Sequence, residues 1–207
     1  MTLKKNPFRV ALTGGIGCGK SLALQCFCRC GAAVFSADAI AAEVRDGEGM
    51  SQKILGLFGD EVADAASGRI RPGVLAGKIF SDPGARAALE ALLHPEIRRR
   101  IMEMTAAADA EIAVTEVPLL FECGWQGDFD CTVAVWSDRE TVLGRMPGRS
   151  WDEAEYLRRA SAQLPAEKKL EMADFGLVNN GTAESLMRQC ADLMIFWKNQ
   201  MEVSCNV

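Results

Sequence analysis

The chain has 207 residues, of which 49% are hydrophobic and 25% are charged, and its formal net charge is −5. This balance suits a globular domain with its own core and excludes a largely disordered chain. The negative charge argues against a general nucleic-acid or anionic-membrane binder, and the single histidine, His94, excludes a multi-histidine metal site within this chain.

Cysteine content and apolar runs indicate the compartment. Eight cysteines are too few for a small disulfide-stapled scaffold of this length. The apolar run Val10–Leu12 follows Pro7 and Arg9, so it predicts a short buried strand rather than a signal peptide. No run approaches the roughly 18–20 apolar residues that a membrane span needs. We therefore expect a cytoplasmic protein with reduced thiols, no membrane partner and no nucleic-acid partner; its oligomeric state stays open.

Short apolar runs alternate with helical patterns along the chain. The expected strands are residues 8–13, 33–36, 111–117, 131–136 and 175–178. Helices are expected from Lys20 to Cys30, after Ser36, and from Thr182 to about Met201. Strands separated by helices predict an α/β fold in which a parallel sheet has both faces covered.

Two further patterns concern the helices. Ser137-x-x-Glu140 and Ser150-x-x-Glu153 match the capping box that opens a helix. Residues 49–100 predict almost only helices, which we interpret as an insertion in a single domain spanning 1–207. Bases are frequent in residues 69–102 and 139–169. They form solvated helix faces or flank a site for an anionic ligand.

The segment GGIGCGKS, Gly14–Ser21, matches the phosphate-loop pattern G-x-x-x-x-G-K-[ST] and lies between an expected strand and an expected helix. Its glycines let successive backbone N–H groups point at one phosphate, and the helix N-terminus adds partial positive charge. Lys20 supplies a charge to the β- and γ-phosphates, and Ser21 offers a hydroxyl to Mg²⁺. The motif predicts a nucleoside triphosphate with Mg²⁺ but does not separate kinases from other NTPases.

Asp38 is the candidate catalytic carboxylate. It follows the second expected strand, and ligands bind at the carboxyl ends of parallel strands, so it is expected to face the phosphate loop. There it can accept the proton of an acceptor hydroxyl or hold the Mg²⁺ shell through water. It also suits an N-cap for a helix starting at Ala39. No N-K-x-D motif supports a GTPase, and the third strand lacks the terminal acid of a motor ATPase.

From about residue 9 to residue 193 the chain resembles the dephospho-coenzyme A kinase family, which catalyses the last step of coenzyme A synthesis. The matching segments are ALTGGIGCGKS, ADAIA, LEALLHPEIR, VPLLFE, the Arg-rich run ending at Gln163, and ADFGLVNNG. The combination of HP with PLLFE separates this family from other small P-loop kinases. The resemblance implies transfer of the ATP γ-phosphoryl to the ribose 3′-hydroxyl of dephospho-CoA. It also implies a P-loop NTPase-type core, a helical acceptor-side subdomain (49–107) and a lid (139–169).

The resemblance also implies roles for single residues. Asp38 is the catalytic base, Lys20 acts on the phosphates, and Arg149, or else Arg145, stabilises the transferring group. The implied ATP-binding residues are Gly15, Gly17, Cys18, Gly19, Lys20, Ser21, Leu22 and Asn179, with Asn179 near the adenine. The implied acceptor-side residues are Asp38, His94, Leu119, Leu120 and Phe121. His94 is otherwise a packing or capping residue at a helix start, and PLLFE is otherwise only a corner of the sheet.

Some positions depart from the family pattern. They are Ser36 in place of Asp, Leu22 in place of Thr or Ser, Arg71-Pro72 in place of Asn/Asp-Arg, and a lid segment MPGRSW about one residue short. They bear on affinity and lid geometry rather than on the reaction. Cys18 would lie at a helix N-terminus near positive charge, which predicts a lowered thiol pKa and a reactive thiol that ATP protects.

Two other functions stay open at this stage. One is a P-loop kinase for another small hydroxyl or nucleotide acceptor, and the other is a nucleotide-binding module without turnover.

Overall fold

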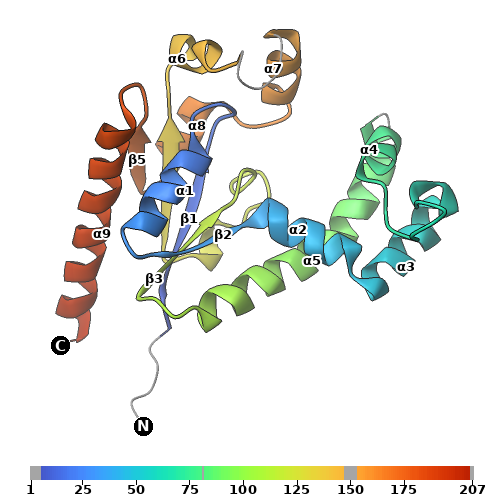
Figure 1. Cartoon of the computed structure of the whole chain (residues 1–207), viewed down its shortest axis with the longest axis horizontal. Coiled ribbons are helices and arrows are strands. Elements are labelled where there is room, and N and C mark those ends of the chain that lie inside the picture. The colour runs from blue at the N-terminus through green and yellow to red at the C-terminus, as the bar shows by residue number, and fades with distance from the viewer. Residues whose placement is uncertain (1–5, 81, 147–152, 206–207) are drawn as a thin grey trace. The chain divides into compact units, whose positions relative to one another are not determined.

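The computed structural model describes residues 6–80, 82–146 and 153–205. Within them five strands form one parallel sheet in the order β2-β3-β1-β4-β5 (Figure 1). The strands are β1 (Phe8–Gly14), β2 (Ala33–Ser36), β3 (Ile112–Glu116), β4 (Cys131–Trp136) and β5 (Phe175–Val178). The α/β fold and each predicted strand are confirmed, because every strand end lies within one residue of its expected position.

Helices occupy most of the rest of the described chain. They are α1 (Lys20–Arg29), α2 (Ala37–Asp46), α3 (Glu48–Phe58), α4 (Pro72–Phe80), α5 (Pro83–Ala107), α6 (Arg139–Gly144), α7 (Glu153–Ala160), α8 (Ala166–Met172) and α9 (Ala183–Cys205), with short 3₁₀ turns η1 (Asp60–Val62) and η2 (Gln126–Asp128). In the described part of the chain, no helix combines the length and apolar content that crossing a membrane requires.

The chain divides into two compact units. Unit 1 comprises the described parts of residues 1–36 and 104–207 and contains the whole sheet, whereas unit 2 comprises Ala37–Glu103 and is helical. The phosphate-loop motif therefore belongs to unit 1, and Asp38 and His94 belong to unit 2.

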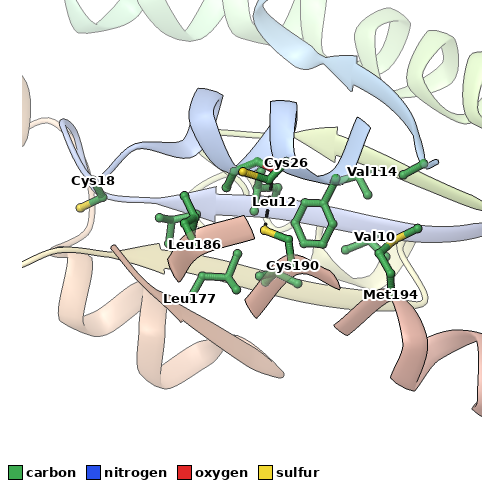
Figure 2. Packing of buried hydrophobic residues seen from close by; sticks show 14 of the residues in the cluster. Val10, Leu12, Cys18, Cys26, Val114, Leu177, Leu186, Cys190 and Met194 are labelled. Carbon is green, nitrogen blue, oxygen red and sulfur yellow. Dashed lines mark hydrogen bonds between the residues drawn. The ribbon is translucent and has the colours of Figure 1, made fainter. Parts of the chain in front are cut away.

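The core of unit 1 lies between the sheet and the helices α1 and α9. Val10 and Leu12 of β1 are fully buried in it (Figure 2). They lie on the same face of the sheet, because alternate side chains of a strand point to the same side. Trp197 of α9 stacks on Phe27 of α1, with ring centroids 5.7 Å apart. Each such side chain contributes about 1.5–3 kcal/mol by leaving water, so this core fixes the strand ends that carry the functional loops.

Unit 2 has a smaller core of its own. Buried residues of α3, η1, α4 and α5 form it together with Ile70, and they are Ile54, Phe58, Val62, Ile70, Leu75 and Leu89. The backbone of Arg71 donates to the Val62 carbonyl at 2.7 Å, and Pro72 then begins α4. Pro is well tolerated at a first helical position, so the Arg71-Pro72 sequence is a helix start.

Two expectations about helix ends are corrected. Helix α6 begins at Arg139, and its N-cap is Asp138, whose carboxylate accepts from the Thr141 N–H at 2.7 Å. Ser137 is therefore not the capping residue, because its neighbour already satisfies the first turn. The second capping box starts at Ser150, which lies outside the described residues. Helix α9 begins directly after Thr182, as expected, but continues to Cys205 rather than ending near Met201.

Candidate active site

The phosphate loop joins β1 to α1 at the carboxyl end of a central strand. Gly14, Gly17 and Gly19 have φ angles of 146°, 79° and 92°, a region in which side chains are strained. A Cβ atom on Gly14 would lie 2.3 Å from the carbonyl oxygen of Val135 on the neighbouring strand β4. Glycine is therefore needed at this corner for space as well as for backbone conformation.

The N-terminus of α1 is suited to an anion. Its N-cap is Gly19, and in the described chain no side chain caps this end. The first-turn N–H groups and the helix dipole thus favour a negative ligand here. Lys20, the first helical residue, donates from Nζ to the carbonyls of Gly14 at 3.2 Å and Gly15 at 3.0 Å. Ser21 is exposed in the same turn. The loop therefore concentrates donors and positive charge where phosphates would bind.

Three side chains from outside the phosphate loop form a hydrogen-bond network with its backbone. The Asn179 side-chain amide donates to the Cys18 carbonyl at 2.9 Å. The Ser137 hydroxyl donates to the Asn179 carbonyl at 2.7 Å and lies 3.3 Å from the Cys18 carbonyl. Arg145 donates to the Ser137 hydroxyl at 3.1 Å and to the Asn179 carbonyl at 2.7 Å. These contacts join the loop to the segments after β4 and β5.

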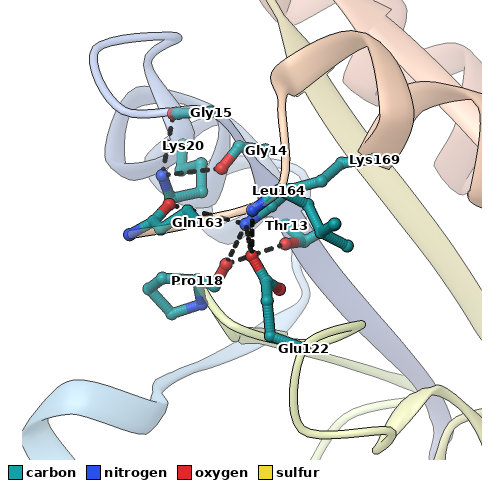
Figure 3. A network of polar contacts seen from close by, with 9 residues as sticks. All are labelled: Thr13, Gly14, Gly15, Lys20, Pro118, Glu122, Gln163, Leu164 and Lys169. Atoms are coloured by element: carbon teal, nitrogen blue, oxygen red, sulfur yellow. Dashed lines mark hydrogen bonds and ion pairs between the residues drawn. The ribbon is translucent and has the colours of Figure 1, made fainter. Parts of the chain in front are cut away.

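A second polar network lies beside the loop (Figure 3). Lys169 of α8 is fully buried and forms an ion pair with Glu122 at 2.9 Å. The same Glu122 oxygen accepts from the backbone N–H of Leu164 at 2.8 Å. This network links the segment after β3 to the segment before α8.

The comparisons with known proteins agree with one another. A family model described as dephospho-CoA kinase matches residues 8–185. The chain is 38% identical over 185 residues to a dephospho-CoA kinase of Thermus thermophilus, covering 89% of each chain. A crystal structure of a Thermus thermophilus protein superposes with a TM-score of 0.81 at 36% identity, covering 92% of this chain and 98% of that one.

The chain belongs to the dephospho-CoA kinase family. A solved dephospho-CoA kinase from Campylobacter jejuni superposes with a TM-score of 0.69 at 26% identity, covering 91% of this chain and 96% of that one. The family resemblance predicted from the sequence is therefore confirmed, and so is the P-loop kinase type of fold. Membership makes this chain an ATP-dependent kinase of dephospho-CoA rather than a binding module without turnover.

The expected lowering of the pKa of the Cys18 thiol is wrong. The side chain is 1% exposed, and burial raises the pKa of the thiol, outweighing the lowering by the Ser137 contact and by the charge of Lys20. A helix N-terminus lowers a thiol pKa, but the desolvation of a buried thiolate raises it and can outweigh that effect. The backbone of Cys18, by contrast, stays in the phosphate loop as expected.

Two apolar side chains of the PLLFE segment are buried. Leu120 is 0% exposed and Phe121 is 9% exposed, so both side chains belong to the interior of unit 1. Little or nothing of these two side chains is exposed, and the acceptor contacts expected for Leu120 and Phe121 stay predictions. Leu119 is half-buried, and its acceptor contact stays a prediction. The sequence pattern could not separate the buried from the half-buried side chains, because Leu119, Leu120 and Phe121 are all apolar.

Two residues in unit 2 were assigned to the acceptor side. Asp38 is exposed in the first turn of α2, which begins at Ala37, so it is not an N-cap. His94 is half-buried within α5, and Pro95 lies inside that helix, so His94 does not mark a helix start. Their roles in catalysis and acceptor binding stay predictions.

Of the two arginines expected in the lid, the structure describes Arg145. Arg145 ends α6 and is held by Ser137 and Asn179, whereas Arg149 lies outside the described residues. Asn179 is 2% exposed, and its amide binds the loop backbone; its nearness to adenine stays a prediction. The sequence pattern does not indicate Ser137 and Lys169 as residues near the phosphate loop. It predicts Ser137 only as a cap, and no local pattern marks a buried lysine.

Proposed function

We propose that this enzyme positions ATP on the phosphate loop and transfers its γ-phosphoryl to the ribose 3′-hydroxyl of dephospho-CoA, with Asp38 as the base. The observation that carries the ATP half is the glycine loop before α1, whose N-cap leaves the first-turn N–H groups for phosphate oxygens. Lys20, whose Nζ donates to the carbonyls of Gly14 and Gly15, can reorient to the β- and γ-phosphates.

Ser21 is the residue that would hold Mg²⁺. Its exposed hydroxyl lies next to Lys20 in the first turn of α1, and a hydroxyl oxygen is a fitting ligand for this hard cation. Held by Ser21, the ion would neutralise charge on the ATP phosphates. Leu22, which replaces a hydroxyl residue of the family, is half-buried and packs against the core of unit 1, so it does not extend this donor set.

Asp38 is proposed to accept the proton of the 3′-hydroxyl as that oxygen attacks the γ-phosphorus. Its exposed place at the start of α2, two residues after the end of β2, supports this role. Arg149, or else Arg145 directly after α6, is proposed to stabilise charge on the transferring group. The cytoplasmic location is part of the same proposal, because free thiols such as Cys28 and Cys190 fit a reducing compartment.

Replacing Asp38 tests the proposal. In D38N, phosphorylation of dephospho-CoA should fall by about 10²–10⁴-fold, the usual contribution of a general base, because the amide cannot take the proton. ATP binding by unit 1 should change by no more than about threefold, since the nucleotide loop is untouched. Asp46→Asn, at the far end of the same helix and paired with Arg45, is the matched control and should keep the wild-type rate.

The assay follows ATP-dependent phosphorylation of an acceptor panel and locates the new phosphate on the product. A wild-type enzyme that binds ATP but leaves dephospho-CoA unmodified would contradict the proposal. A D38N variant with the wild-type rate would contradict the role of Asp38 alone.

A further inference from the structure

Lys169 is the most unusual charged residue of the described chain. Its side chain is 0% exposed, although burying an ammonium group is costly unless it is paired and fully hydrogen-bonded. The neighbouring Lys168 on the same helix is 57% exposed and pairs with Glu171, as lysines on helix surfaces usually do. A buried position that costs free energy calls for a compensating set of partners.

Those partners use the full donor capacity of the lysine. Nζ lies 2.9 Å from Glu122 Oε1, 2.5 Å from the carbonyl oxygen of Pro118 and 3.5 Å from Gln163 Oε1. An ammonium group has three N–H donors, and here three acceptors surround it. Two of these acceptors come from the loop after β3, and the third comes from the end of the segment that precedes α8.

The network ties together segments that are far apart in the sequence. Glu122 Oε1 accepts both from Lys169 and from the backbone N–H of Leu164. The Pro118 carbonyl accepts both from Lys169 and from the hydroxyl of Thr13, at 3.4 Å, just before the phosphate loop. Lys169 thereby connects the end of β1, the loop after β3 and the Gln163–Leu164 segment (Figure 3).

Helix α8 also touches the phosphate loop directly. A Cβ atom placed on Gly15 would lie 2.7 Å from Cβ of Ala166, so the first turn of α8 packs closely on the loop backbone. Helix α8 is thus held by two contacts, one between Ala166 and the phosphate loop and one between Lys169 and Glu122 of the polar network.

We propose that Lys169 is a positioning residue for phosphoryl transfer, which locks the Gln163–Leu164 segment to the Pro118–Glu122 loop beside the phosphate loop. It acts through its partners and not on the substrate, because it has no exposed surface. The proposal rests on the proposed function, since the groups it aligns are those that surround ATP and its acceptor. Misplacement by about 1 Å can cost about 10²-fold in rate, so a remote lock can have a large kinetic effect.

The test compares Lys169→Met with Lys168→Met. Methionine keeps most of the side-chain volume but loses the three donors. In K169M, kcat should fall by roughly 10–100-fold, whereas KM for ATP should change by less than about threefold because the loop itself is intact. K168M should keep the wild-type kcat. The amide of Leu164 should lose hydrogen-exchange protection in K169M and keep it in K168M.

Further arms keep the test decisive. If K169M does not fold, Glu122→Gln replaces it, and the same loss of kcat and of Leu164 protection is expected. If K169M folds, the double variant K169M/E122Q should lose no more kcat than K169M alone, since both changes break the same ion pair. A folded K169M with wild-type kcat and wild-type exchange at Leu164 would overturn the proposal, even if its melting temperature falls. A wild-type enzyme inactive on dephospho-CoA would instead contradict the proposed function. Hydrogen exchange at the Leu164 amide would still show whether Lys169 holds the Gln163–Leu164 segment in place.

Discussion

At the level of single residues, the phosphate loop depends on what its backbone carbonyls contact. The Cys18 carbonyl accepts from Asn179, and the Asn179 carbonyl accepts from both Ser137 and Arg145. Asn179 and Ser137 are almost fully buried, so each hydrogen bond avoids the cost of an unsatisfied polar group. The loop is therefore held in shape by neutral amide and hydroxyl groups as well as by its glycines.

The Cys18 thiol is expected to react slowly. Burial both blocks access and raises its pKa, so the thiolate fraction near neutral pH is smaller than for an ordinary thiol. Alkylation by iodoacetamide at pH 8, followed by mass spectrometry, should modify exposed Cys28 at least about tenfold faster than Cys18. Equal rates for the two cysteines in the absence of ATP would contradict this prediction and restore a reactive Cys18.

The sequence predicted the residues of the loop but not how its side chains are used. GGIGCGKS identifies the anion site because glycine and lysine are required there by backbone geometry and charge. Cys18, Leu120 and Lys169 were different, because their exposure depends on contacts with segments distant in sequence. A lysine in a helix between Lys168 and Leu170 gives no local sign that its side chain is buried and pairs with Glu122. Such pairings follow from the tertiary fold and not from periodicity.

At the level of secondary-structure elements, the contact of α8 with the phosphate loop limits which residues fit at Gly15. In G15A the new methyl group would meet Ala166 Cβ at 2.7 Å and Cys18 Sγ at 3.0 Å. Overpacking of this kind costs about 1–3 kcal/mol, which corresponds to roughly 5–150-fold weaker ATP binding if the loop yields. Binding is measured by titration calorimetry.

A compensating change separates steric overlap from other causes. Adding Ala166→Gly to G15A removes the nearer methyl group and should restore part of the ATP affinity. Gly127→Ala, where a Cβ atom meets nothing within 4 Å, is the control and should leave ATP binding unchanged. If Ala166→Gly brings no recovery, the packing of α8 on the loop is not the cause of the defect.

The elements themselves were predictable to different degrees. Each strand was placed within one residue because short apolar runs bounded by glycines and polar residues define a buried parallel strand. Helix ends were less certain, since Ser137 and Asp138 are both good caps and only the hydrogen bond to Thr141 decides between them. The helix start expected at His94-Pro95 is also wrong. Proline is rare inside helices and common at their first turn, but α5 continues through Pro95.

At the level of the whole molecule, the candidate residues are divided between two units, and those expected to bind the acceptor occur in both, since Leu119 lies in unit 1. The phosphate loop belongs to unit 1, whereas Asp38 and His94 belong to unit 2. Each unit has its own buried cluster, around Phe27 and Trp197 in unit 1 and around Ile54 in unit 2. Separate cores permit one unit to be destabilised without loss of the other.

Ile54→Ala tests this independence. Ile54 is 0% exposed, and truncating such a residue costs about 2–5 kcal/mol, which should loosen unit 2. The four tryptophans all lie outside residues 37–103, so fluorescence reports unit 1, whereas hydrogen exchange of α3 and α4 reports unit 2. In I54A, exchange in α3 and α4 should rise and dephospho-CoA phosphorylation should fall, while the urea midpoint by fluorescence and the ATP affinity should stay near wild type. A fluorescence midpoint that drops in step with the loss of α3 protection would show one cooperative core instead, because unit 1 would then depend on unit 2 for its stability.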